Sequence, residues 1–172
     1  MIDLLRSRRS IRRYADRPIE LAHQELLKEA LLRSPSSHHK RPWQFVFVED
    51  RETLGRLARA KPHGSGFLSG AALAIVVCAD SGLSDMWVED CSIAAILAQL
   101  TAHSLGIGSC WVQIRGRTHD DTTPAGEFVR GLLDIPPRLE VETIVGLGYP
   151  AESKPGRRRE ELPWDRVRRH PG

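Results

Sequence analysis

A dense group of arginines lies close to the start of the chain, in the stretch RSRRSIRRY at residues 6–14. If this stretch is locally extended, Arg8, Ser10 and Arg12 point to the same side, because side chains alternate along an extended backbone. Two guanidinium groups and a hydroxyl on one face can bind a phosphate, and each charge-assisted hydrogen bond contributes roughly 1.5–3 kcal/mol when shielded from water. A solvated basic face is the alternative that this stretch, taken alone, leaves open.

A second basic group, KPGRRREELPWDRVRR at residues 154–169, lies near the other end of the sequence. The net charge is only +3, with 25 basic and 22 acidic residues, so positive charge is concentrated in these two stretches. A nucleic-acid-binding protein more often spreads basic residues over one face and interleaves aromatic residues, which make up 6% of this chain. The pattern favours convergence of both groups on one small anion, and we expect no nucleic-acid partner.

The stretch SPSSHHKRPW at residues 34–43 is the third place where polar groups gather. A Pro-Ser-Ser turn before a strand offers hydroxyl and backbone N–H groups at one edge of a sheet, although a plain connecting loop explains the same residues. His38 and His39 are adjacent, so on an extended chain they face opposite sides and do not readily bind one metal ion. With no HExxH motif elsewhere, we expect no metal site.

Length and composition indicate one globular domain that covers residues 1–172, with 41% hydrophobic residues. No apolar run approaches the ~18 residues of a membrane span, and the first residues lack the pattern of a secretory signal. Three cysteines, Cys78, Cys91 and Cys110, form no CxxC pair, which argues against a disulfide framework and for a reducing compartment. We therefore expect a cytoplasmic protein with no membrane association.

Hydrophobic patterning predicts four strands and the helices between them. The first helix after Pro18 carries Leu26, Leu27, Ala30 and Leu31 on one face, and Asp50 caps a shorter helix. Thr123 and Pro124 suit the cap and first position of a later helix. The expected order is α-α-β-α-β-α-β-α-β, a mixed α/β sandwich, with strands at 43–49, 72–79, 109–114 and 141–150.

The longest predicted helix runs from a cap at Asp85 to about Leu105. From Cys91 it reads CSIAAILAQLTAHSL, which is apolar nearly all round, and such a helix is buried on most sides. A domain of this size has little room for so complete a burial. We therefore expect part of this helix to pack against a second subunit.

Taken together, four segments make the chain resemble the FMN-dependent nitroreductase family over its whole length, as a compact branch with short insertions. The segments are RRSIRRYADRPI (8–19), SPSSHHKRPWQFVFV (34–48), EDCSIAAILAQLTAHSLGIGSCWVQIRGR (89–117) and IVGLGYPAESKPGRRR (144–159). The resemblance implies an α+β fold, a three-layer α-β-α sandwich with a central, mainly antiparallel sheet. It also implies a homodimer with FMN at the subunit interface.

The resemblance implies a role for each group of polar residues. The N-terminal group and the basic C-terminal group would hold the flavin phosphate, the loop before the first strand would pack on the isoalloxazine of the other subunit, and backbone amides after the third strand would approach the hydride-accepting edge. These implied cofactor-binding residues are Arg8, Arg9, Ser10 and Arg12, then Arg157, Arg158 and Arg159, then Pro35, Ser36, Ser37, His39 and Arg41, and finally Gln113 and Ile114.

The loop departs from the usual family pattern Pro-Ser-x-x-Asn-x-Gln-Pro-Trp, because His39 stands at the Asn position and Arg41 at the Gln position. A cation beside the flavin would stabilise its anionic reduced form and raise its potential, which is a hypothesis for Arg41.

The implied reaction is a ping-pong transfer of two electrons from NAD(P)H, through FMN, to a nitroaromatic, a quinone or a similar acceptor. The chemistry belongs to the cofactor, so no catalytic side chain is assigned, and His39, Arg41, Arg115 or solvent could each supply a proton. A non-catalytic flavin-binding sensor, or a dehydrogenase-type flavoenzyme on the same fold, is the alternative, since a fold does not determine a function.

Overall fold

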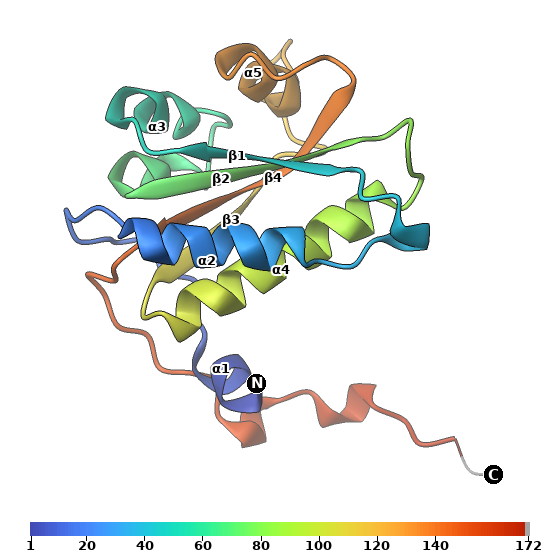
Figure 1. Ribbon diagram of the computed structural model, residues 1–172. Helices are drawn as coiled ribbons and strands as arrows, with labels where there is room; N and C mark the ends of the chain where they lie inside the picture. Colours follow the sequence, from blue (N-terminus) through green and yellow to red (C-terminus); the bar gives the residue numbers. More distant parts are fainter. Residues whose placement is uncertain (171–172) are drawn as a thin grey trace.

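Four strands form one antiparallel sheet in the computed structural model, which describes residues 1–170 (Figure 1). The strand order is β1-β2-β4-β3, so the last strand in sequence lies inside the sheet beside β2 and β3. This arrangement agrees with the expected mainly antiparallel sheet and with the predicted order of elements. The strands are β1 (Trp43–Val48), β2 (Leu73–Asp80), β3 (Gly108–Gln113) and β4 (Leu139–Gly148).

Helices cover both faces of the sheet, which gives three layers (Figure 1). Alternation along β2 places Ile75 and Val77 in the core on one face and Ala74 and Val76 in the core on the other. Every residue from Leu73 to Ala79 is buried, as expected for a strand covered on both sides. The first face carries α2 (Leu21–Leu32) and α4 (Trp87–Ser104), and the second carries α3 (Arg51–Leu57) and α5 (Ala125–Leu132).

The N-terminal segment joins the sheet directly. It begins with α1 (Ile2–Ser7), and then single bridges connect Ser10 to Ser109 in β3 and Tyr14 to Pro150 just after β4. Two glycines make room for this segment: a Cβ at Gly108 would lie 2.9 Å from the Ile11 side chain, and one at Gly148 would lie 2.8 Å from the Tyr14 side chain. The motifs GIGSCW and GLGYP therefore allow the arginine-rich stretch to lie close against the sheet.

Three details of the predicted helices were wrong. Helix α4 begins at Trp87, after Met86, and not at a cap on Asp85. Helix α5 begins at Ala125, one position after the expected first helical residue, so its N-cap is Pro124 and not Thr123. Leu26 is 44% exposed while its neighbour Leu27 is buried, because the buried face of α2 follows Gln24, Leu27 and Leu31.

Helix α4 is buried along one side by the sheet and by α2, and its outward side is apolar. Ile93 and Ile96 are 40% and 38% exposed, whereas Ala94, Ala95 and Ala98 are buried. The sequence predicted this excess of apolar surface from the absence of a polar face. Within residues 1–170, no helix is long and apolar enough to cross a membrane.

Candidate functional site

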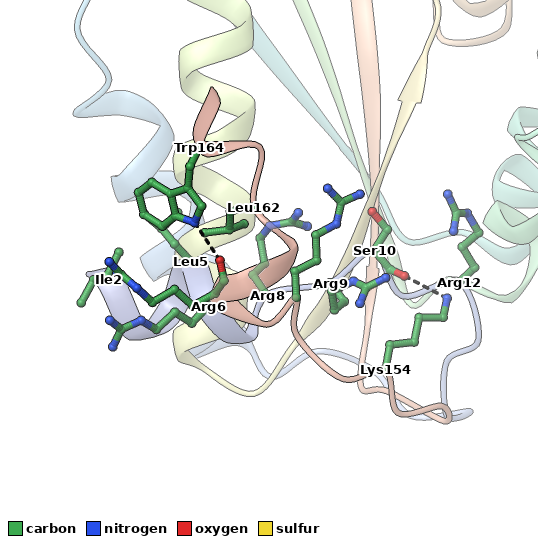
Figure 2. A pocket seen from close by; sticks show the side chains of 12 residues that line it. Ile2, Leu5, Arg6, Arg8, Arg9, Ser10, Arg12, Lys154, Leu162 and Trp164 are labelled. Carbon is green, nitrogen blue, oxygen red and sulfur yellow. Dashed lines mark hydrogen bonds between the residues drawn. The ribbon is translucent and has the colours of Figure 1, made fainter. Parts of the chain in front are cut away.

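The two arginine-rich groups lie together in space, although they are about 140 residues apart in sequence (Figure 2). The Arg9 guanidinium donates a hydrogen bond to the carbonyl oxygen of Pro155, and a Cβ at Gly156 would collide with the carbonyl oxygen of Arg6. The C-terminal segment therefore packs directly against the end of α1. Between them lies a cavity of about 990 Å³, whose polar lining is Arg6, Arg8, Arg9, Ser10, Arg12, Lys154, Arg157 and Arg159.

Five of these cations have no anionic partner among residues 1–170. No carboxylate there lies within 4.0 Å of the guanidinium groups of Arg8, Arg9, Arg12, Arg157 or Arg159. Arg158, by contrast, does not line the cavity, and its Nε donates to Glu161 at 2.8 Å. Because these cations lie close together without counter-charges, the cavity is strongly positive and favours an anionic ligand.

Two residues that were not among the predicted site residues, Glu152 and Lys154, connect the N-terminal segment to the C-terminal segment at this cavity. Glu152 Oε1 accepts hydrogen bonds from the backbone N–H groups of Arg12 at 2.6 Å and Arg13 at 3.2 Å. It also accepts one from Lys154 Nζ at 3.0 Å, and Lys154 in turn donates to the carbonyl oxygen of Ser10 at 3.0 Å (Figure 2). Lys154 is the first residue of the second basic group of the sequence, and the signal for Glu152 was its place just after the GLGYP motif.

The hydrogen bonds to Glu152 make protein stability depend on pH. The N–H of Arg12, followed by Lys154, lowers the pKa of Glu152 to about 2 from an ordinary value of 4.5. Because the folded-state pKa lies below the unfolded one, the stabilisation is complete above about pH 5 and is lost as the pH falls toward 2. We expect Glu152→Gln to lower the melting temperature at neutral pH and the difference from wild type to shrink between about pH 5 and 3. Thermal unfolding across this range measures it, and a difference that is independent of pH would contradict the assignment.

The loop before β1 lies at the opposite end of α4 from the arginine cavity. Ser37 N–H donates to Asp90 Oδ1 at 2.9 Å, in the first turn of α4, while Ser7 Oγ contacts His103 Nε2 at 2.7 Å, in its last turn. His103 follows Asp90 by thirteen positions, which correspond to about 20 Å along a helix. Within one chain, the loop and the arginine cavity are therefore separate.

The same loop is held in a strained shape. His38, His39 and Arg41 all have positive φ, at 49°, 56° and 48°, a region that costs a non-glycine residue roughly 1–2 kcal/mol. Ser36 Oγ accepts a hydrogen bond from the Arg41 N–H at 2.9 Å and closes the loop. Pro35, His39 and Arg41 are exposed, so the loop presents a proline, an imidazole and a guanidinium to its surroundings.

Asp90 is the residue that anchors this strained loop. It is 3% exposed, and its Oδ2 is buried without a hydrogen-bond partner within residues 1–170. We expect Asp90→Ala to lower the free energy of unfolding by about 2 kcal/mol and the melting temperature by ~4–8 °C. We also expect faster tryptic cleavage after Lys40, because the Ser37 N–H loses its acceptor and the loop opens. Asp85→Ala, on the exposed segment before α4, is the matched control, and equal cleavage rates in both variants would refute the anchoring role.

Gln113 and Ile114 lie where β3 ends, but their hydrogen-bonding groups are used within the chain. The Ile114 side chain is fully buried, and its N–H donates to the carbonyl oxygen of Glu142 at 3.2 Å. The Gln113 carboxamide accepts from Trp111 Nε1 and donates to the carbonyl oxygen of Arg115, both at 3.0 Å. Gly116 follows with φ 68°, and within the described residues its N–H has no acceptor.

Comparison with known proteins confirms the resemblance. The sequence profile of the nitroreductase family matches residues 5–63 and 59–149. A candidate NADH dehydrogenase/NAD(P)H nitroreductase of Archaeoglobus fulgidus is 41% identical over an alignment of 157 residues that covers 89% of this chain and 87% of that protein. The structure of an FMN-dependent nitroreductase from Clostridium difficile R20291 matches with a TM-score of 0.98 and 40% identity, covering both chains completely.

A further structure, a candidate NADH dehydrogenase/NAD(P)H nitroreductase from Parabacteroides distasonis, matches with a TM-score of 0.89 and 29% identity over 99% of this chain and 98% of that one. The chain belongs to the nitroreductase family.

Proposed function

We propose that this chain is an FMN-dependent NAD(P)H oxidoreductase and that its arginine cavity holds the phosphate of FMN. The observation that carries the proposal is the convergence of Arg8, Arg12 and Arg157, none of them paired with a carboxylate, in one cavity. The similar Clostridium difficile protein is described as FMN-dependent, which supports the choice of ligand.

The residues fit a phosphate in charge and in hydrogen bonding. A phosphate monoester carries close to two negative charges at neutral pH, and guanidinium groups bind its oxygens in pairs. Arg8, Arg12, Lys154 and Arg157 would surround the phosphate, with the Ser10 hydroxyl as a further donor. Arg158 takes no part in this arrangement, because it is outside the cavity lining and is paired with Glu161.

The proposed enzyme is a homodimer with two-fold symmetry. The flavin-facing loop at Ser36–Arg41 and the arginine cavity lie at opposite ends of α4 within one chain. A two-fold pair with antiparallel α4 helices would place the loop of one chain beside the cavity of the other, so that each site needs both chains. The exposed Ile93 and Ile96 on α4 supply the apolar surface for this contact.

Bound FMN would accept two electrons from NAD(P)H and pass them to a nitroaromatic, a quinone or a similar acceptor. The protein's part is to bind both substrates in turn in one cleft, to exclude water and to hold the negative charge of the reduced cofactor. The N–H of Gly116 is available for this within the described residues, whereas that of Ile114 already bonds the Glu142 carbonyl oxygen.

The test is turnover by the purified protein. We expect a yellow preparation from which heat releases FMN, and steady-state oxidation of NADH or NADPH with menadione or a nitroaromatic as acceptor. A flavin-loaded protein that oxidises neither nucleotide would favour the alternative, a flavin-binding sensor. A colourless protein that does not take up added FMN would overturn the proposal.

A further inference from the structure

A carboxyl group is buried in the sheet directly beside the turn that follows β3. The pairing of β2 with β4 shifts between Val77, opposite Thr143, and Cys78, opposite Val141, so Glu142 is the extra residue of a β-bulge. Its carbonyl oxygen accepts hydrogen bonds from both Ile114 at 3.2 Å and Arg115 at 3.0 Å. The bulge therefore fixes the backbone of this turn and aims the Glu142 side chain at it.

The carboxylate lies between a carboxamide and a guanidinium. Oε1 accepts a hydrogen bond from Gln113 Nε2 at 3.4 Å, and Oε2 lies 3.9 Å from Arg115 Nε. The side chain is 5% exposed, and within residues 1–170 Oε2 is buried with no hydrogen-bond partner. The Arg115 guanidinium lies over the Trp87 ring, 5.6 Å from its centroid, so it is shared between an indole face and a carboxylate.

The surroundings of the Glu142 carboxyl group contain features that favour its ionised state and features that favour its protonated state. A buried ionised carboxylate with an unsatisfied oxygen is costly unless a cation approaches, and a proton removes the cost. Burial raises the pKa of Glu142, while the Gln113 hydrogen bond and the Arg115 charge oppose the rise and Glu89 on α4 adds to it. The Cys91 thiol, also on α4, has its own pKa raised by burial and remains neutral.

We propose that Glu142 is a positioning residue that holds Arg115 when it is ionised and releases it when Oε2 takes a proton from solvent. In the ionised state, the guanidinium is drawn toward Oε2 and the turn at 113–116 is held by backbone and side chain together. In the protonated state, the backbone contacts of the bulge and the Gln113 hydrogen bond to Oε1 remain, and Arg115 turns its full charge outward. The consequence for catalysis rests on the proposed function, because it requires the flavin edge to lie at this turn.

The switch itself is a property of the protein without cofactor, and Trp87 reports it. We expect the tryptophan fluorescence of the FMN-free protein to change in one step as the pH rises through a value above that of an ordinary glutamate, because Arg115 moves relative to the indole ring. The step should disappear in E142Q and in W87F. It should persist in E140Q, a matched variant two residues away on the same strand, where Glu140 pairs with Arg130 at 2.8 Å.

A second variant keeps the proposal testable if E142Q does not fold. R115Q removes the guanidinium whose movement over the Trp87 ring produces the signal, so the fluorescence step should disappear in this variant too. A step that survives in E142Q or in R115Q would overturn the proposal, as would a wild-type protein without any step.

The link to catalysis is measured separately on the FMN-loaded enzyme. We expect the pH profile of kcat/KM to lose one limb in E142Q and to keep it in E140Q. If the protein binds no flavin, the fluorescence titration still decides the role of Glu142, so failure of this inference and failure of the proposed function are distinguishable. A loaded enzyme with the same pH profile in E142Q and wild type would confine Glu142 to a structural role and refute its positioning of Arg115 in catalysis.

Discussion

Replacing two unpaired arginines, in the double variant Arg8→Ala/Arg12→Ala, is expected to weaken FMN binding by at least about 100-fold. Each guanidinium forms a charge-assisted contact with the proposed phosphate, worth roughly 1.5–3 kcal/mol, and 1.4 kcal/mol corresponds to a factor of ten in affinity. Neither arginine forms an ion pair within residues 1–170, so its replacement leaves no acidic side chain without a partner. The effect should therefore fall on ligand binding and leave the melting temperature of the FMN-free protein almost unchanged.

The dissociation constant follows from quenching of flavin fluorescence during titration with the FMN-free protein. Arg138→Ala is the control for loss of a surface arginine. It removes one positive charge, against two in the double variant, and Arg138 lies just before β4 with its Nε 3.7 Å from Asp80. Riboflavin, which lacks the phosphate, separates the contributions: its affinity should hardly change in the double variant. An FMN affinity within a factor of three of wild type would show that the phosphate lies elsewhere.

Placing two charges on the outward side of α4, in Ile93→Glu/Ile96→Glu, is expected to abolish the dimer and FMN binding together. The two side chains are 40% and 38% exposed, so the change has little cost for the isolated chain. In the proposed two-fold pair, however, each glutamate would be buried in an apolar contact, which costs several kcal/mol per charge. Because each site is proposed to need both chains, loss of pairing should release the flavin.

Sedimentation velocity gives the oligomeric state, and absorbance of the gel-filtered protein gives the bound flavin. Glu127→Lys changes the charge by the same amount, with the opposite sign, on α5 in the other helical layer, and should leave both unaltered. A double variant that still sediments as a dimer would remove α4 from the interface. One that is monomeric and still yellow would mean that a single chain completes the flavin site.

Local patterns in the sequence were enough to locate most of the elements. A continuous apolar run predicted that β2 is buried on both faces. The apolar runs and the turn residues between them predicted the first and last residue of each strand to within about two positions. Helix starts were less accurate, because Asp85 and Thr123 are good capping residues that the chain does not use. A cap depends on the path by which the chain enters the helix, and that path is decided by packing.

The sequence by itself determined the kinds of chemistry available: two concentrated arginine groups, a Ser-rich loop and a helix with more apolar surface than one chain can bury. Only the tertiary structure decided which of these groups meet. In the folded chain, Lys154 donates a hydrogen bond to the carbonyl oxygen of Ser10, and Arg157 lines the cavity while Arg158 does not. Glu142 lies at a bulge, with its side chain buried. The physical reason is that periodicity and turn chemistry act over a few neighbouring residues. Contacts across more than a hundred residues, and the register of a bulge, depend on which strands become neighbours in the sheet.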